Sequence, residues 1–98
     1  MTYELDFAVE AAKEWKKLDA TIRKQFAKKL KERLENPHVP ASRLRNMQDC
    51  YKIKLRTIGY RLVYVVKDET ITVTVIAVGR RDDGEVYDEA PTRLSRQL

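Results

Sequence analysis

Cationic side chains at a spacing of two residues are the feature of this sequence best suited to chemistry. Positions 52, 54 and 56 alternate with apolar residues, so in an extended strand their side chains would share one face. A turn and later strands could bring two further arginines to the same place. The full set is Lys52, Lys54, Arg56, Arg61 and Arg81. No acid interrupts residues 51–67, whereas solvated faces usually mix signs, so the pattern predicts an anion-binding concavity.

One aromatic residue, Tyr87, follows the charged loop that contains Arg81. An aromatic ring beside cations suits a nucleotide, because the ring can stack on a base while the cations hold phosphate. Simple packing of the tyrosine is the alternative interpretation.

Further basic residues follow the second predicted helix, the loop after it and the strand ends. They form either a solvated surface or a surface that contacts the phosphates of RNA. The RNA-binding hypothesis places them at Arg23, Lys24, Lys28, Lys31, Arg43, Arg45, Arg56 and Arg80. Lys29 and Arg33 belong to the same basic helix face.

Other reactive groups are few. No P-loop, zinc site or Ser-His-Asp arrangement is present, so we expect neither a metal nor a cofactor. His38 stands alone in a loop between Pro37 and Val39 and is expected to be solvated. Cys50 is the single cysteine, which excludes an internal disulfide, and is expected to act as a small apolar residue entering a strand.

Composition sets the outer limits. The 98 residues predict one domain spanning 1–98, and 43% hydrophobic residues predict a folded chain. Twenty Lys and Arg against 15 Asp and Glu give a net charge of +5, which favours an acidic partner. No basic leader and no apolar run of roughly 18 residues occur, so we expect a soluble, cytoplasmic protein without a membrane partner.

The elements that must position the cationic groups begin with a strand over residues 3–7. A helix from Ala8 to Leu18 follows, and Asp19 or Thr21 can cap a second helix that stops at Asn36-Pro37. The buried stripe of this second helix is expected at Ile22, Phe26, Ala27, Leu30 and Leu34. A short link between the helices predicts an antiparallel hairpin.

After a loop over residues 37–48, the period becomes two. Strands are predicted from residue 51, over 60–67 and over 71–78, with Gly79 as the end of the last and a weakly helical segment over 85–98. Both faces of the 60–67 strand are apolar, which indicates a central position. The fold class is therefore α+β: a helical hairpin on one face of an antiparallel three-stranded meander, with the first strand joined to the meander edge.

These residues together resemble one family, the RelE toxins. The resemblance is carried by DCYKIKLR at 49–56, GYRLVY at 59–64, VGRR at 78–81 and EVY at 85–87, and by LDF at 5–7 with KEWKKL at 13–18. It extends from residue 3 to about residue 90. No single tripeptide is specific, but the spaced set is.

The resemblance implies a microbial-ribonuclease-like α+β fold and cleavage of mRNA in the ribosomal A site. The 2′-hydroxyl attacks the scissile phosphate without a metal, and the catalytic positions fall on Lys52, Lys54, Arg61, Arg81 and Tyr87. Lys52 or Lys54 would be the base, its pKa lowered by neighbouring cations. Arg61 would hold the phosphate, Arg81 would assist the leaving group by proton donation or by charge alone, and Tyr87 would stack on a base.

The implied partners are the ribosome with its 16S rRNA, the mRNA, and a RelB-like antitoxin through which the complex would repress its operon on operator DNA. Asp82, Asp83 and Pro91 depart from the family pattern. Two alternatives remain: a ParE-like toxin that poisons DNA gyrase, and a non-catalytic RNA-binding module. The cationic set with Tyr87 argues against the gyrase-poisoning toxin. A lysine with a lowered pKa would argue against the non-catalytic module.

Overall fold

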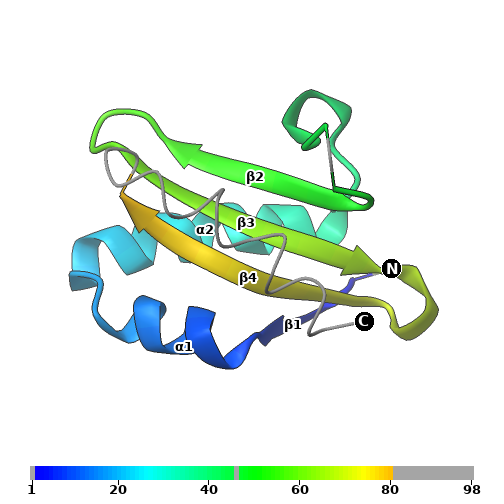
Figure 1. Cartoon of the computed structure of the whole chain (residues 1–98), viewed down its shortest axis with the longest axis horizontal. Helices are drawn as coiled ribbons and strands as arrows, with labels where there is room; N and C mark the ends of the chain where they lie inside the picture. The colour runs from blue at the N-terminus through cyan, green and yellow to red at the C-terminus, as the bar shows by residue number, and fades with distance from the viewer. Residues whose placement is uncertain (1, 46, 81–98) are drawn as a thin grey trace.

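A four-stranded sheet forms the centre of the structure, a computed structural model that describes residues 2–45 and 47–80 (Figure 1). Its strands are β1 (Glu4–Phe7), β2 (Cys50–Leu55), β3 (Tyr60–Lys67) and β4 (Thr72–Arg80), in the spatial order β1-β4-β3-β2. Strands β2, β3 and β4 form the predicted antiparallel meander, and β1 joins its edge by parallel pairing with β4. The α+β prediction and the central position of β3 are confirmed.

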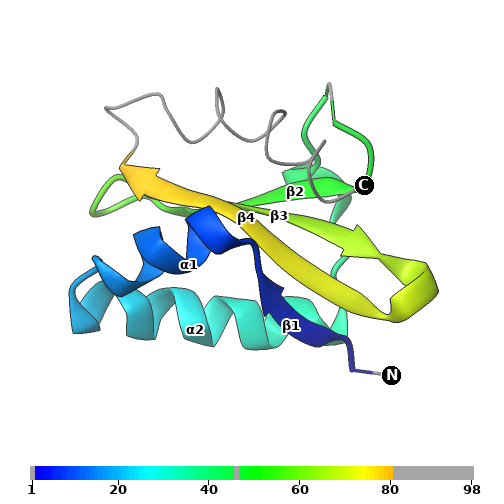
Figure 2. The same ribbon diagram turned by 60° about the horizontal axis from the view of Figure 1, so that its bottom comes forward.

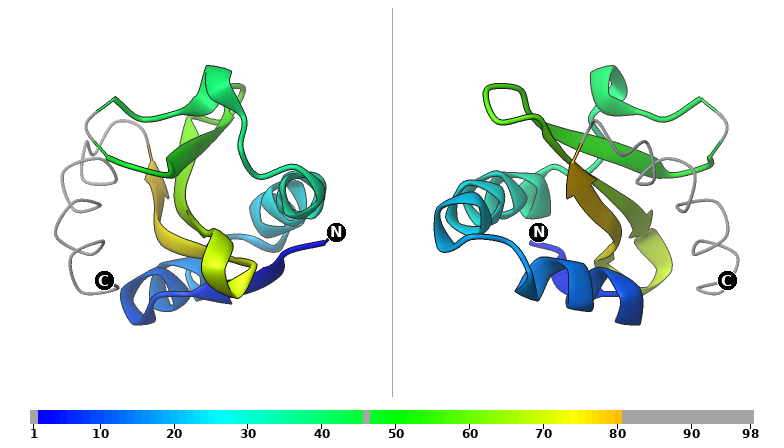
Figure 3. Two further views of the ribbon diagram at one scale, coloured as in Figure 1. Left: turned by 90° about the vertical axis from the view of Figure 1, so that its right-hand side faces the viewer. Right: turned by 60° about the vertical axis from the view of Figure 1, so that its left-hand side comes forward.

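Two helices, α1 (Val9–Lys16) and α2 (Ala20–Glu35), lie on the same side of the sheet (Figure 2). Helix α1 packs mainly against β4, whereas α2 packs against β2 (Figure 3). Trp15 of α1 links β1 and α2, because its ring centroid lies 5.2 Å from that of Phe7 and 6.3 Å from that of Phe26. Neither helix, in the part of the chain that the structure describes, is long and apolar enough to cross a membrane.

The buried stripe of α2 is narrower than the sequence predicts. Phe26 and Leu30 are buried, and Ile22 and Leu34 are partly buried, as expected. Ala27 is exposed, so its predicted burial is wrong. The reason is angular: each residue turns the helix by about 100°, which carries position 27 past the stripe centred on Phe26 and Leu30.

Strand β4 is longer than the sequence predicts. Gly79 does not end it: Gly79 pairs with Arg61, and Arg80 pairs with Tyr60. The sequence predicts a strand end at this glycine because glycine weakens strands, but ladder pairing with β3 continues through it. Strand β4 therefore extends to the end of the sheet at which β3 begins, beside Arg61.

Cys50 begins β2 and is fully buried, as predicted for a small apolar residue. Burial, with a smaller contribution from the charge of Asp49, raises the pKa of the thiol to about 12. Because the thiolate is the reactive form, the native thiol should be inert at about pH 8. We expect labelling by a thiol reagent to be limited by unfolding and to become rapid in denaturant. Complete labelling within seconds under native conditions would contradict this burial.

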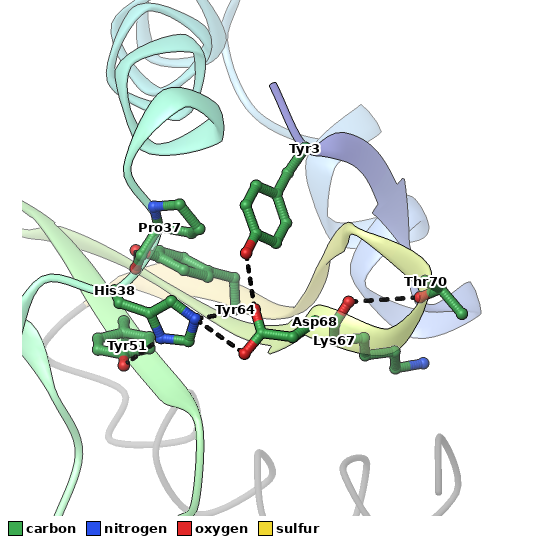
Figure 4. Close-up of polar contacts among 8 residues, drawn as sticks. All are labelled: Tyr3, Pro37, His38, Tyr51, Tyr64, Lys67, Asp68 and Thr70. Atoms are coloured by element: carbon green, nitrogen blue, oxygen red, sulfur yellow. Dashed lines mark hydrogen bonds and ion pairs between the residues drawn. The ribbon is translucent and has the colours of Figure 1, made fainter. Parts of the chain in front are cut away.

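A polar network closes the end of the sheet at the β3–β4 turn (Figure 4). The Tyr3 hydroxyl donates to Oδ1 of Asp68 at 2.7 Å, and Nε2 of His38 lies 2.9 Å from the same oxygen. On the other side of the imidazole, Nδ1 of His38 lies 2.8 Å from the Tyr51 hydroxyl. His38 is exposed to solvent, as expected, and it also bridges β2 and the turn, which the sequence does not predict. Its partners are 13 and 30 residues away in sequence, beyond the reach of local patterns.

This network makes stability depend on pH through Asp68. Its hydrogen bond from Tyr3, and secondarily that with His38, lower the pKa of the Asp68 carboxyl below its ordinary 3.8. Because the pKa of Asp68 is lower in the folded than in the unfolded chain, its ionised form stabilises the fold at pH values above 3.8. This stabilisation is lost as the pH falls below 3.8 and through the lowered pKa. The thermal midpoint should therefore fall more steeply below about pH 4 in the wild type than in Asp68→Asn. Tyr3→Phe should also flatten the curve, and parallel curves for all three proteins would refute this role.

Candidate active site

Three of the five cationic side chains predicted to act together lie on one face of the β2–β3 hairpin. Lys54 pairs directly with Arg61, and Lys52 pairs with Val63. Alternation along β2 places Lys52 and Lys54 on one face and the buried Tyr51 and Ile53 on the other. We call Lys52, Lys54 and Arg61 the cationic face, and for these three the predicted shared face is confirmed. Arg56, predicted on the same strand face, follows β2 in the turn, and Arg81 lies outside the described residues.

Helix α2 lies against the opposite face, as Tyr64 shows. Tyr64 pairs with Tyr51 across the strands, and the two rings stack with centroids 5.6 Å apart. The guanidinium of Arg33 from α2 lies over the Tyr64 ring, 5.8 Å from its centroid. The helices thus support the hairpin from one side, and the cationic face belongs to the other.

Electrostatic repulsion from neighbouring cations lowers the pKa of Lys54. The charge of Lys52 is the largest cause that lowers the pKa of Lys54, followed by desolvation and by the charge of Arg61. Each of these disfavours the ammonium form, so the neutral amine is more available than in an isolated lysine. The direction agrees with the sequence-based prediction that neighbouring cations lower the pKa of a lysine at this site.

A cavity of about 230 Å³ lies at the β2–β3 turn, beside Lys54 and Arg61. Leu55, Arg56, Gly59 and Tyr60 complete its described lining. Gly59 has a φ of 70°, the left-handed conformation that glycine adopts at no steric cost, and this closes the turn tightly. Three of the six lining residues are cationic, so the cavity fits an anion such as phosphate.

The remaining predicted RNA-binding residues are spread over several elements. Lys24, Lys28 and Lys31 are exposed on α2 and Arg23 is half-buried there. Arg43 and Arg45 lie in the segment between the short 3₁₀ helix at Pro40–Ser42 and β2, Arg56 lies in the β2–β3 turn, and Arg80 ends β4. Because Arg80 pairs with Tyr60, alternation directs its side chain to the face opposite Arg61.

Arg81 and Tyr87 lie outside the described residues, as do Asp82, Asp83 and Pro91. Their proposed roles therefore stay predictions. Within residues 2–45 and 47–80, no group of three or more His, Cys, Asp or Glu could hold a metal ion.

One basic residue of α2 was placed wrongly by the sequence. The sequence predicts Arg33 on the exposed basic face of the helix, but the residue is half-buried and points toward β2. It donates to the Tyr64 hydroxyl at 2.9 Å, to the Lys52 carbonyl at 3.4 Å and to the Ser42 hydroxyl at 3.2 Å. The available signal was its spacing of seven from Phe26, which puts both on nearly the same helix face.

Comparison with known proteins gives consistent results. A family model described as the ParE toxin of the type II toxin–antitoxin system parDE matches residues 5–84. The mRNA interferase toxin RelE of Escherichia coli K12 is 57% identical over 94 residues, which covers 96% of this chain and 99% of that protein. A putative RelE-like toxin protein of E. coli is 52% identical with the same coverage.

Solved structures agree with the sequence comparison. A mutant of E. coli toxin RelE in the free state superposes with a TM-score of 0.88 at 57% identity, covering 95% of this chain and 98% of that one. A chain of the intact E. coli RelBE toxin–antitoxin complex gives a TM-score of 0.78 at 59% identity, covering 80% and 95% of the two chains.

Proposed function

Because the chain belongs to the RelE toxins of the ParE-toxin family of type II toxin–antitoxin systems, we propose that it cleaves mRNA in the ribosomal A site. The observation that carries this proposal is the 57% identity to an mRNA interferase over 94 residues. The chain is thus an endoribonuclease that inhibits translation.

The chemistry follows from the cationic face. A base removes the proton of the 2′-hydroxyl, and the resulting oxygen attacks the adjacent phosphorus. The bond from phosphorus to the 5′-oxygen breaks, and this oxygen takes up a proton either from Arg81 or from solvent. The products are a 2′,3′-cyclic phosphate and a 5′-hydroxyl. Lys54 is the base, since its neutral form is favoured by Lys52.

The other cationic groups stabilise charge and position the RNA. Arg61 holds the non-bridging phosphate oxygens through the planar fork of its guanidinium. Arg81 stabilises the leaving 5′-oxygen, and Tyr87 stacks on a base of the codon. Lys52 lowers the pKa of Lys54 and adds positive charge at the phosphate.

Dependence on the ribosome follows from the groups that the site offers as base and acid. A lysine and an arginine are poorly matched to neutral pH as base and acid, unlike a histidine and a carboxylate. The ribosome supplies the missing factor by holding the codon in the geometry for in-line attack. The exposed lysines of α2 and the arginines of the loop before β2 contact 16S rRNA.

The partner that controls this activity is a RelB-like antitoxin, since the E. coli relative is solved as a RelBE toxin–antitoxin complex. A largely disordered, partly acidic antitoxin would fold on this basic chain. The complex represses its operon through the antitoxin, and the toxin acts in the cytoplasm, where ribosomes translate.

Expression in a bacterial host separates this proposal from gyrase poisoning, the activity of ParE toxins. We expect incorporation of labelled methionine to stop within minutes while DNA synthesis continues and no DNA-damage reporter is induced. Co-expression of the adjacent reading frame should restore growth, and Lys54→Met serves as the inactive control. Early induction of the damage reporter with continued protein synthesis would favour the gyrase-poisoning alternative.

A further inference from the structure

A second set of cavities runs along the outer edge of β2, between this strand and α2. One, of about 280 Å³, is lined by Arg33, Ala41, Ser42, Lys52, Lys54 and Arg56. The next, of about 330 Å³, shares Lys54 and Arg56 and adds Gln25, Lys29, Leu55 and Thr57. We call these two cavities the outer groove.

The walls of the outer groove carry hydrogen-bond donors from both elements. On α2, Gln25, Lys29 and Arg33 are spaced by four residues, which places them in one row along the helix. On the other wall, β2 is the edge strand among the described strands, and its residues Lys52 and Lys54 line the groove. The groove is therefore continuous with the cationic face, because both share these two lysines.

Arg33 is the informative group, because it is a half-buried cation without a counter-ion among the described residues. All three of its hydrogen-bond partners there, Tyr64, Ser42 and the Lys52 carbonyl, are neutral. Partial burial of a charge is unfavourable unless the charge is paired, and three further cations line the same cavity.

Geometry leaves Arg33 able to bind a further acceptor. A guanidinium has five N–H donors, and the described contacts account for three hydrogen bonds. The Tyr64 hydroxyl in turn donates to the Pro37 carbonyl at 2.8 Å, so Tyr64 holds the guanidinium in place. Ser42 adds a hydroxyl that can donate to the same acceptor.

We propose that Arg33 and Ser42 form a phosphate subsite at the outer edge of β2, which holds an RNA phosphodiester beside the cationic face. The inference rests on the proposed function for the identity of the ligand as RNA. The phosphodiester comes either from the mRNA next to the scissile phosphate or from ribosomal RNA that borders the A site. In both cases the subsite fixes the hairpin that carries Lys52 and Lys54 against its substrate.

Two variants and a control test the subsite. Arg33→Met removes the guanidinium. Ser42→Asp gives Arg33 an internal counter-ion that competes with phosphate, while the new carboxylate can still accept the hydrogen bond that Arg33 donates to Ser42. Each variant makes the net charge more negative by one unit. The matched control is Lys13→Met, which makes the same change at an exposed position of α1. Thermal midpoints of all three report any structural loss separately.

The measurement is the affinity of each protein for a short 2′-O-methyl RNA, which cannot be cut, and for vacant ribosomes, over a series of salt concentrations. Both variants should bind about tenfold more weakly, the loss expected for one charge-assisted phosphate contact. The slope of log affinity against log salt should become shallower by about 0.7, the value for one phosphate of a single strand. Lys13→Met removes a charge outside the groove, so it should leave the affinity within about twofold of the wild type and the slope unchanged.

The outcomes distinguish the source of the phosphate and the fate of each proposal. Loss confined to the oligonucleotide assigns the subsite to mRNA, and loss confined to ribosomes assigns it to ribosomal RNA. Affinities and slopes equal to those of Lys13→Met overturn the subsite and leave Arg33 as a brace between α2 and β2. If the wild type binds RNA with the predicted slope change in the variants but never cleaves on ribosomes, the proposed function fails and the subsite stands.

Discussion

Replacing Lys54 by methionine is expected to slow single-turnover cleavage on programmed ribosomes by roughly a hundredfold to ten-thousandfold, the usual contribution of a general base. Methionine keeps the length and apolar stem of lysine, so the cross-strand position opposite Arg61 stays filled. Ribosome binding should weaken only a few-fold, because many other cations remain. A rate within about threefold of the wild type would remove Lys54 from the chemistry.

The pH profile of Lys52→Met tests the same assignment from the other side. The charge of Lys52 is the largest cause that lowers the pKa of Lys54, so its removal should raise that pKa toward the ordinary 10.5. Less of the neutral amine would exist at any given pH, and the rising limb of the rate profile should move to higher pH. A profile that keeps its position while the rate falls would instead make Lys52 the base.

The second large effect is expected at Arg61. Arg61→Ala removes a contact that strengthens as charge develops on the phosphate, which costs roughly a hundredfold to a thousandfold in rate by analogy with an oxyanion donor. It also removes one of the charges that lower the pKa of Lys54, so its pH profile should move upward as well. Both changes act in the same direction at neutral pH.

Arg61→Lys separates the two effects. Lysine keeps the positive charge and hence the lowered pKa of Lys54, but it lacks the planar fork that binds two oxygens at once. We expect an intermediate rate with an unshifted pH profile, measured in the same single-turnover assay. Full activity of Arg61→Lys would show that only the charge matters, and full activity of Arg61→Ala would exclude Arg61 from the site.

Local patterns were sufficient for most of the fold. The change from a helical period to a period of two after residue 48 located β2, and the doubly apolar run at 60–67 located the central strand. Errors occurred where a local rule met a competing constraint. Ala27 is apolar but lies past the narrow contact stripe of α2, and Gly79 weakens a strand but remains paired with Arg61.

The shared face of Lys52, Lys54 and Arg61 could be predicted because strand alternation and a tight turn leave few other arrangements. The spacing of the cations also predicts a lowered pKa for Lys52 or Lys54, and the structure gives it for Lys54. Arg33 and His38 could not be placed in this way. Their hydrogen-bond partners come from other elements, which local patterns do not reveal. A charged residue in a helix is also usually exposed, whereas Arg33 is half-buried.

The most direct test of the central claim is primer-extension mapping of mRNA ends in a translating extract, with purified ribosomes present or omitted. We predict cuts within codons at the A site of stalled ribosomes, ending in 2′,3′-cyclic phosphates, and no cuts in the same mRNA without ribosomes. Lys54→Met should leave no such ends. Efficient cutting of naked mRNA, or intact mRNA on ribosomes with translation still arrested, would contradict the account.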